Sequence, residues 1–135
     1  MVRTCEVNID YYLGAYGKTI IIITQSRKWL LLLKESIIKV IDNAIDVLDI
    51  CQLTPAKLGK SISKLELTKV RSSVSPCITA KNEEESTNFI WKKDEEELWT
   101  VVGLIDGLLR NDNPGHQYLA DDDYIIELSY NEQLL

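Results

Sequence analysis

The chain contains one histidine, His116, which makes this residue the first candidate for acid–base chemistry. A general base needs a positioned nucleophile or acid beside it, and a zinc site normally needs several His or Cys ligands. No motif around residues 114–118 supplies such partners. We therefore expect His116 to bond the backbone or to line a surface that a partner contacts, and we expect the protein not to be an enzyme.

Carboxylates gather in three short runs, residues 83–85, 94–97 and 121–123. Asp121, Asp122 and Asp123 could coordinate a hard cation, but the glycine and the terminal glutamate of an EF-hand loop are missing. Such runs are typical of solvated turns and helix N-termini, and they also suit contact with a basic partner. We expect neither a metal nor another cofactor.

The signature strings of dinucleotide sites, phosphate loops, serine hydrolases and zinc proteases do not occur in this sequence. Gly103 and Gly107 are spaced as in GxxxG, and we expect them to allow close packing of a helix on a sheet. The three tryptophans are not interleaved with basic residues. Core positions are therefore expected for Trp29, Trp91 and Trp99, and no nucleic-acid partner is expected.

The composition is that of a folded domain, with 45% hydrophobic and 27% charged residues. A length of 135 residues suits one hydrophobic core, so we expect a single domain over residues 1–135. The N-terminus lacks the apolar stretch of a secretory signal, and the apolar runs are far shorter than the ~20 residues that cross a bilayer. We expect a cytoplasmic protein without membrane contact, in which Cys5, Cys51 and Cys77 are buried free thiols.

The formal charge of −6 is unevenly distributed. Up to Ser75 there are 11 Lys and Arg residues against 7 Asp and Glu, and from Pro76 onward there are 4 against 14. An acidic second half argues against nucleic acid or an anionic membrane as the partner and permits a basic protein.

In the first half, residues 4–12 alternate polar and apolar side chains, as in a half-buried strand. Residues 18–24 are apolar on both faces, which is typical of a central strand, and the glycines at 14 and 17 predict a hairpin between the two. Ser26 suits the N-cap of a helix that runs from about Arg27 into the low forties. Residues 47–53 fit either a short strand or a continuation of that helix.

In the second half, residues 61–71 alternate as a strand, and residues 77–81 and 87–92 predict a second hairpin. Asp94 suits the N-cap of a second helix that ends near Asn111, and residues 117–120 and 124–130 predict two final strands. The order of elements lacks the regular repeat of a doubly wound fold. We predict an α+β fold, an antiparallel-rich sheet with two main helices packed on one face.

The last third of the chain also forms a recognisable series of segments. They are Phe89-Ile90-Trp91, Asp94 to Trp99, Leu104 to Leu109, Gly115 to Leu119 and Ile125 to Glu132. This series resembles the end of small immunity proteins that are encoded beside bacterial polymorphic or contact-dependent growth-inhibition toxins. The resemblance covers about a third of the chain and leaves residues 1–75 without a counterpart.

The resemblance implies a protein without catalytic residues that binds a cognate toxin domain, often a nuclease, and blocks its active site or substrate path. An acidic surface would pair with the basic cleft of such a toxin. The residues expected to contact it are Glu95, Glu96, Asp121, Asp122 and Asp123 for charge, with His116 and Tyr118 as further contact groups. The alternative is a regulatory or structural subunit of a larger assembly, and the oligomeric state stays open.

Overall fold

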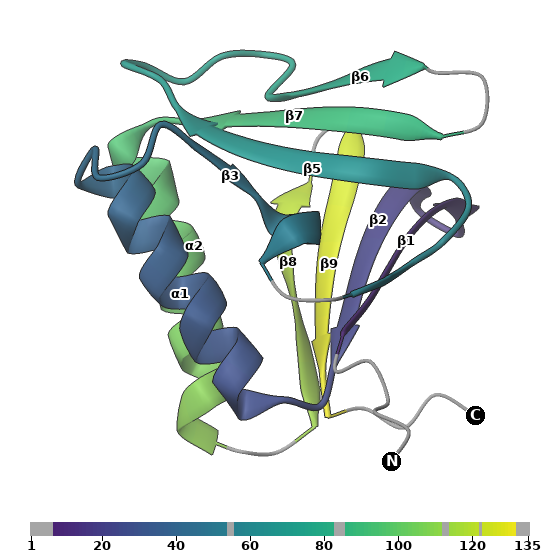
Figure 1. The fold of residues 1–135 in the computed structure, drawn as a ribbon, viewed down its shortest axis with the longest axis horizontal. Coiled ribbons are helices and arrows are strands. Elements are labelled where there is room, and N and C mark those ends of the chain that lie inside the picture. The colour runs from purple at the N-terminus through teal and green to yellow at the C-terminus, as the bar shows by residue number, and fades with distance from the viewer. Residues whose placement is uncertain (1–6, 54–55, 83–85, 112–113, 122, 132–135) are drawn as a thin grey trace.

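Two β-sheets and two helices make up the fold (Figure 1). The computed structural model describes residues 7–53, 56–82, 86–111, 114–121 and 123–131. The predicted α+β class is confirmed, but the strands form a five-stranded sheet in the order β4-β1-β2-β9-β8 and a four-stranded sheet in the order β3-β5-β7-β6. Both sheets are mixed, because β1 with β4, β2 with β9 and β5 with β7 pair in parallel.

The predicted first hairpin is confirmed. Strand β1 (Val7–Gly14) pairs antiparallel with β2 (Gly17–Thr24), and Gly14 stands opposite Gly17 across the turn. Gly17 has φ +128°, a backbone conformation that residues other than glycine rarely adopt.

Helix α1 (Arg27–Ile41) begins at the predicted cap, where the Ser26 hydroxyl accepts a hydrogen bond from the Trp29 N–H at 3.1 Å. Its apolar stripe is buried, and Arg27 Nη1 donates to the Leu109 carbonyl at 2.6 Å. That bond joins the start of α1 to the end of α2 (Glu95–Asn111).

The segment that the sequence left undecided contains a strand and a helical turn. Strand β3 (Val47–Asp49) leads into a 3-10 helix (Ile50–Gln52), followed by β4 (Lys57–Leu58) and β5 (Ile62–Lys69). The Asp49 carboxylate stabilises this junction by accepting hydrogen bonds from the N–H groups of Cys51 at 3.1 Å and Leu65 at 3.2 Å.

The second half follows the predicted order of elements. Strands β6 (Ile78–Asn82) and β7 (Thr87–Lys93) form the second hairpin, and β8 (Gly115–Asp121) and β9 (Tyr124–Tyr130) form the last antiparallel pair. Helix α2 starts with a capping box, in which Asp94 Oδ1 accepts from the Glu97 N–H at 2.8 Å and Glu97 Oε1 accepts from the Asp94 N–H at 3.1 Å.

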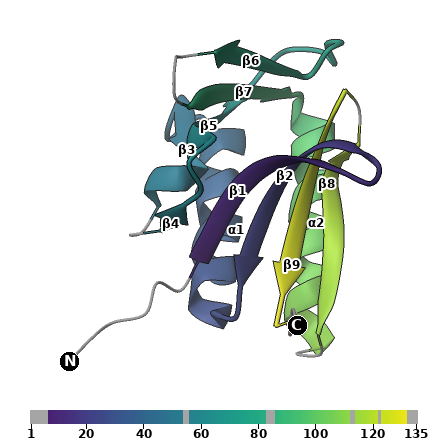
Figure 2. The ribbon, with the colours of Figure 1, turned by 90° about the vertical axis from the view of Figure 1, so that its right-hand side faces the viewer.

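Both helices lie on the same side of the five-stranded sheet, and the four-stranded sheet lies across one end of this layer (Figures 1 and 2). Tyr11 on β1, Phe89 on β7 and Tyr124 on β9 join the two sheets, with ring centroids 4.8 to 6.1 Å apart. Among the described residues, neither helix is long and apolar enough to cross a membrane.

The predicted core residues separate into two groups. Trp29 and Trp91 are buried, and Cys51 and Cys77 are buried free thiols, whereas Cys5 lies outside the described residues. Trp99 is 47% exposed, so its predicted core position is wrong: α2 packs through the side opposite this residue.

The prediction of close helix packing at the two glycines of α2 is also wrong. A methyl group at Gly103 would have no atom within 4 Å, and one at Gly107 would make an ordinary contact, 3.7 Å from Gln117 Nε2. Neither position requires the absence of a side chain.

Candidate functional site: the outer face of the five-stranded sheet

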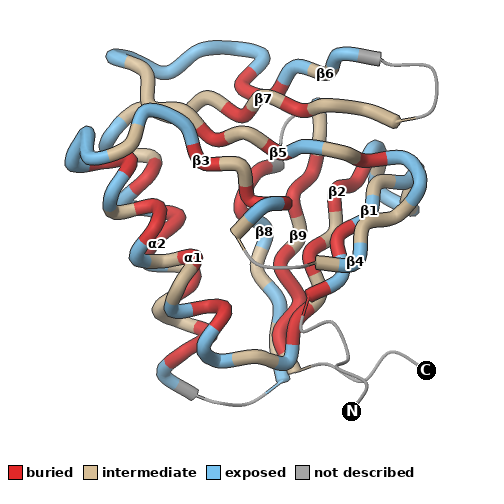
Figure 3. Tube along the Cα trace, viewed as in Figure 1, coloured by how far each residue is buried: buried red, intermediate tan, exposed pale blue. Residues whose placement is uncertain are grey.

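Alternate residues of β2 point to opposite sides of the five-stranded sheet. Ile20 and Ile22 are fully buried against the helices, whereas Ile21 and Ile23 point to the other side and are partly exposed. Figure 3 shows this alternation along the strand. In Figure 2 the helices lie behind the sheet, and the side that faces the viewer carries no helix. The sequence correctly predicts a central strand with two apolar faces, but only one of those faces packs against the core.

Strand register arranges the side without a helix, here called the outer face, in rows that run across β1, β2, β9 and β8. The first row is Asp10, Ile21, Glu127 and Tyr118; the second is Asn8, Ile23, Ser129 and His116; the third is Tyr12, Thr19, Ile125 and the register position of Asp121. Three of these residues, Ser129, Thr19 and Ile125, are buried. These strands come from the two ends of the chain, so their side chains meet only through the parallel pairing of β2 with β9.

Aromatic side chains stand at both margins of the outer face. Tyr12 on β1 is 44% exposed and Tyr118 on β8 is 43% exposed. His116 packs edge-on against Tyr118, with centroids 5.6 Å apart and an interplanar angle of 78°. Because tyrosine offers a large, rigid contact area with a polar end, it is a frequent centre of protein–protein binding energy.

A β-bulge in β8 brings the backbone position of Asp121 into register with the rows that contain His116 and Tyr118. The register of β8 against β9 shifts between Tyr118 and Ala120, so that Asp121 pairs with Ile125 in the outer rows. Without the bulge, positions 118 and 121 would belong to rows on opposite sides of the sheet, because positions along a strand alternate sides with a period of two. His116, Tyr118 and the register position of Asp121 therefore share the outer face.

Two carboxylates flank Ile21 in the first row. Asp10 Oδ1 accepts a hydrogen bond from the Tyr11 N–H at 2.8 Å, and the Gly59 N–H donates to the Ile9 carbonyl at 2.8 Å. A methyl group at Gly59 would lie 1.9 Å from Asp10 Oδ1, so the carboxylate occupies the space that the glycine leaves free. Glu127 is the second carboxylate and lies next to Tyr118. Negative charge is thus interleaved with apolar and aromatic contact area.

The remaining predicted contact residues lie elsewhere. Glu95 and Glu96 are exposed in the first turn of α2, in the helix layer behind the sheet, with the exposed Trp99 one turn further along. Asp123 is exposed in the turn before β9, and Asp122 and the side chain of Asp121 lie outside the described residues. The structure therefore does not bring the predicted carboxylates into a single cluster.

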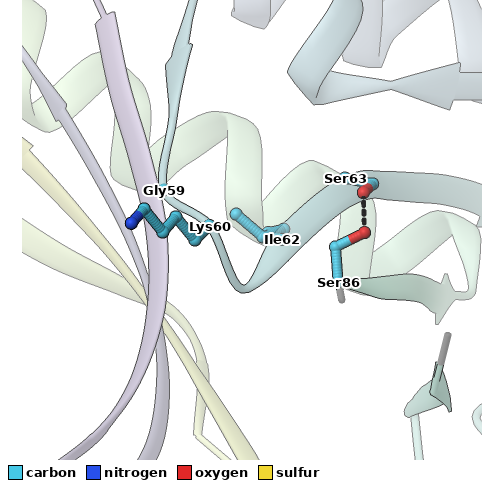
Figure 4. A pocket seen from close by; sticks show the side chains of 5 residues that line it. All are labelled: Gly59, Lys60, Ile62, Ser63 and Ser86. Carbon is cyan, nitrogen blue, oxygen red and sulfur yellow. Dashed lines mark hydrogen bonds between the residues drawn. The ribbon is translucent and has the colours of Figure 1, made fainter. Parts of the chain in front are cut away.

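An open cleft at the start of β5 contains two serine hydroxyls and a lysine (Figure 4). It has a volume of about 570 Å³ and is lined by Gly59, Lys60, Ile62, Ser63 and Ser86. The hydroxyls of Ser63 and Ser86 are hydrogen-bonded to each other, but the Lys60 amine points away from both. A serine nucleophile needs a base within hydrogen-bond reach, and the residues that line this cleft do not place one there.

Within the described ranges, no three His, Cys, Asp or Glu residues are grouped as metal ligands.

Nine positions of the outer face are not predicted as contact residues from the sequence: Asn8, Asp10, Tyr12, Thr19, Ile21, Ile23, Ile125, Glu127 and Ser129. The available signal was the apolar run of β2, which also fits a strand buried on both sides.

No protein-family model, curated protein or solved structure matches this chain.

Proposed function

We propose that the protein is a non-catalytic, cytoplasmic binding protein that neutralises a basic toxin domain, as bacterial immunity proteins do, and that the outer face is its contact surface. The observation that carries this proposal is the composition of the first row. Two carboxylates, Asp10 and Glu127, alternate there with Ile21 and Tyr118 on a side of the sheet without a helix.

The outer face carries apolar and aromatic side chains among its polar residues, although one side of an antiparallel sheet is often turned to water. Ile21, Ile23 and two half-exposed tyrosines lie within the same three rows. Exposed apolar and aromatic area of this kind is characteristic of surfaces that become covered by a partner.

The charges of the molecule indicate which partner would fit. The formal charge is −6, and Asp10 and Glu127 stand among the apolar contacts of the outer face. Lysine or arginine side chains of a nuclease cleft would pair with these carboxylates, and long-range attraction would speed association. Nucleic acid itself would be repelled.

Trp99 supports the second candidate function, a subunit of a larger assembly. Its side chain is 47% exposed on α2, and this helix lies behind the outer face in Figure 2. A protein that joins two neighbours would need two separate contact surfaces, and tryptophan is among the residues most enriched at the centres of such contacts.

The experiment that tests the proposal uses the purified product of the neighbouring reading frame, because immunity proteins are encoded beside their toxins. Its binding to this chain is titrated by calorimetry at low and high salt, and its toxicity is assayed with and without the chain. The proposal expects salt-sensitive 1:1 binding that abolishes toxicity and is weakened by Tyr118→Ser. Leu31→Ser on α1 is the matched control, since Leu31 is also exposed but lies in the helix layer.

Absence of binding, or persistent toxicity of the bound product, would contradict the immunity role. Binding that is unchanged by Tyr118→Ser but lost in Trp99→Ser would move the contact to α2 and favour the subunit role.

A further inference from the structure

The turn between β1 and β2 carries the two most exposed large hydrophobic side chains of the described residues. Leu13 is 80% exposed and Tyr16 is 85% exposed. The turn sequence Leu-Gly-Ala-Tyr-Gly, residues 13–17, contains no charged or amide side chain. Figure 2 shows this turn projecting beyond the side of the five-stranded sheet.

Neither side chain is needed to close the hairpin. The turn is formed by the Gly14–Gly17 pair, by the positive φ of Gly17 and by the Thr19 hydroxyl, which donates to the Gly17 carbonyl at 2.9 Å. Exposed turn positions usually hold Asn, Asp, Ser or Gly, which satisfy the backbone locally and remain hydrated. Leu13 and Tyr16 therefore expose apolar area to water although their side chains do not help to form the turn.

The turn is continuous with the outer face. Tyr12 belongs to the third row of that face and precedes Leu13 directly, and its ring lies close to Gly14, where an added methyl would be 3.0 Å from Tyr12 Cε2. Lys18, which follows the turn directly in sequence, places its amine over the Tyr124 ring, 5.3 Å from the ring centroid. A partner that covers the outer face thus reaches an uncharged, projecting tip at the margin of the contact.

We propose that Leu13 and Tyr16 form a wedge that inserts into an apolar recess of the same toxin-like protein that covers the outer face. This inference rests on the proposed function. Because the tip projects, the matching surface of the partner would be concave, and because the tip carries no charge, that surface would be apolar. A protein fits better than an anionic lipid surface, because the chain carries a formal charge of −6 and the adjoining face holds Asp10 and Glu127.

The test compares three forms of the full chain in titrations with the purified product of the neighbouring reading frame. The wedge variant carries Leu13→Ser and Tyr16→Ser, and the matched control carries Leu31→Ser and Val74→Ser, two substitutions at residues exposed elsewhere. The wedge variant should bind roughly 10- to 100-fold more weakly, mainly through faster dissociation. Its thermal midpoint should equal that of the wild-type chain, and the control should bind like the wild type.

Each alternative outcome is distinct. Wild-type binding with an unchanged affinity of the wedge variant would overturn the wedge and leave the proposed function standing. Lack of wild-type binding would remove the proposed function and the wedge with it. A lowered thermal midpoint of the wedge variant would assign these residues to the fold. Sedimentation of the wild type, but not of the wedge variant, with phosphatidylcholine–phosphatidylglycerol vesicles would replace the protein recess by a lipid surface.

Discussion

Neighbouring isoleucines of β2 should respond differently to one and the same substitution. Ile22 is fully buried, so Ile22→Thr removes apolar contact and also buries a hydroxyl. Loss of the terminal Cδ1 methyl group costs about 0.5–1.5 kcal/mol, and the unpaired buried hydroxyl that replaces Cγ1 adds about 1–3 kcal/mol. We expect the free energy of unfolding to fall by about 2–4 kcal/mol, a large part of the ~5–15 kcal/mol that stabilises a typical domain.

Ile21→Thr should behave as a surface substitution. Ile21 is partly exposed on the outer face, where threonine keeps the β-branched shape and its hydroxyl can reach water. The expected loss is below about 1 kcal/mol. Urea unfolding of both variants measures the difference as a shift of the midpoint at constant m-value. Equal, large losses at both positions would show that the second side of β2 is covered, and the assignment of the outer face would be refuted.

Three further predictions concern α2 and the core. Gly103→Ala should raise the free energy of unfolding by up to about 1 kcal/mol and the thermal midpoint by a few degrees, because the new methyl group has no atom within 4 Å. Asp94→Ala removes half of the capping box and should lower the free energy of unfolding by about 1 kcal/mol, measured by urea titration. Burial, assisted by the charge of Asp49, raises the pKa of the Cys51 thiol to about 12, so native protein should resist alkylation there at pH 8 to 9, as mass spectrometry would show.

These predictions have their own controls. Asp94→Asn retains a side-chain acceptor and should recover most of the capping loss, whereas equal effects of alanine and asparagine would exclude capping as the cause. Since the Cys51 pKa is raised above its ordinary value of 9.0, the stability linked to its neutral thiol is fully present below pH 9 and is lost as pH rises toward 12. Rapid alkylation of Cys51 in folded protein would contradict its burial.

Local chemistry was sufficient to predict most elements of the fold. Ser26 and Asp94 cap the two helices as expected, because a cap depends on residues within one turn. The glycines around the first turn likewise predicted the hairpin of β1 and β2. The two-sheet arrangement could not be predicted in this way, because β2 pairs in parallel with β9 from the other end of the chain.

The candidate site was predictable only in part. His116 and Tyr118 were selected as contact groups, and they lie together on the outer face. Asp10 and Ile21 could not be associated with them, since their row depends on the register of three strand pairs. Tryptophan is usually buried at least in part, so the sequence predicts a core position for Trp99. The residues of α2 that face the core do not include it.

The most direct test of the central claim is a methyl NMR titration of isoleucine-labelled chain with the product of the neighbouring reading frame. If the outer face is the contact surface, the signals of Ile21 and Ile23 should shift or broaden at a 1:1 ratio, while Ile105 in the buried stripe of α2 stays unchanged. Unchanged Ile21 and Ile23 signals in a formed complex, or shifts confined to α2, would contradict it.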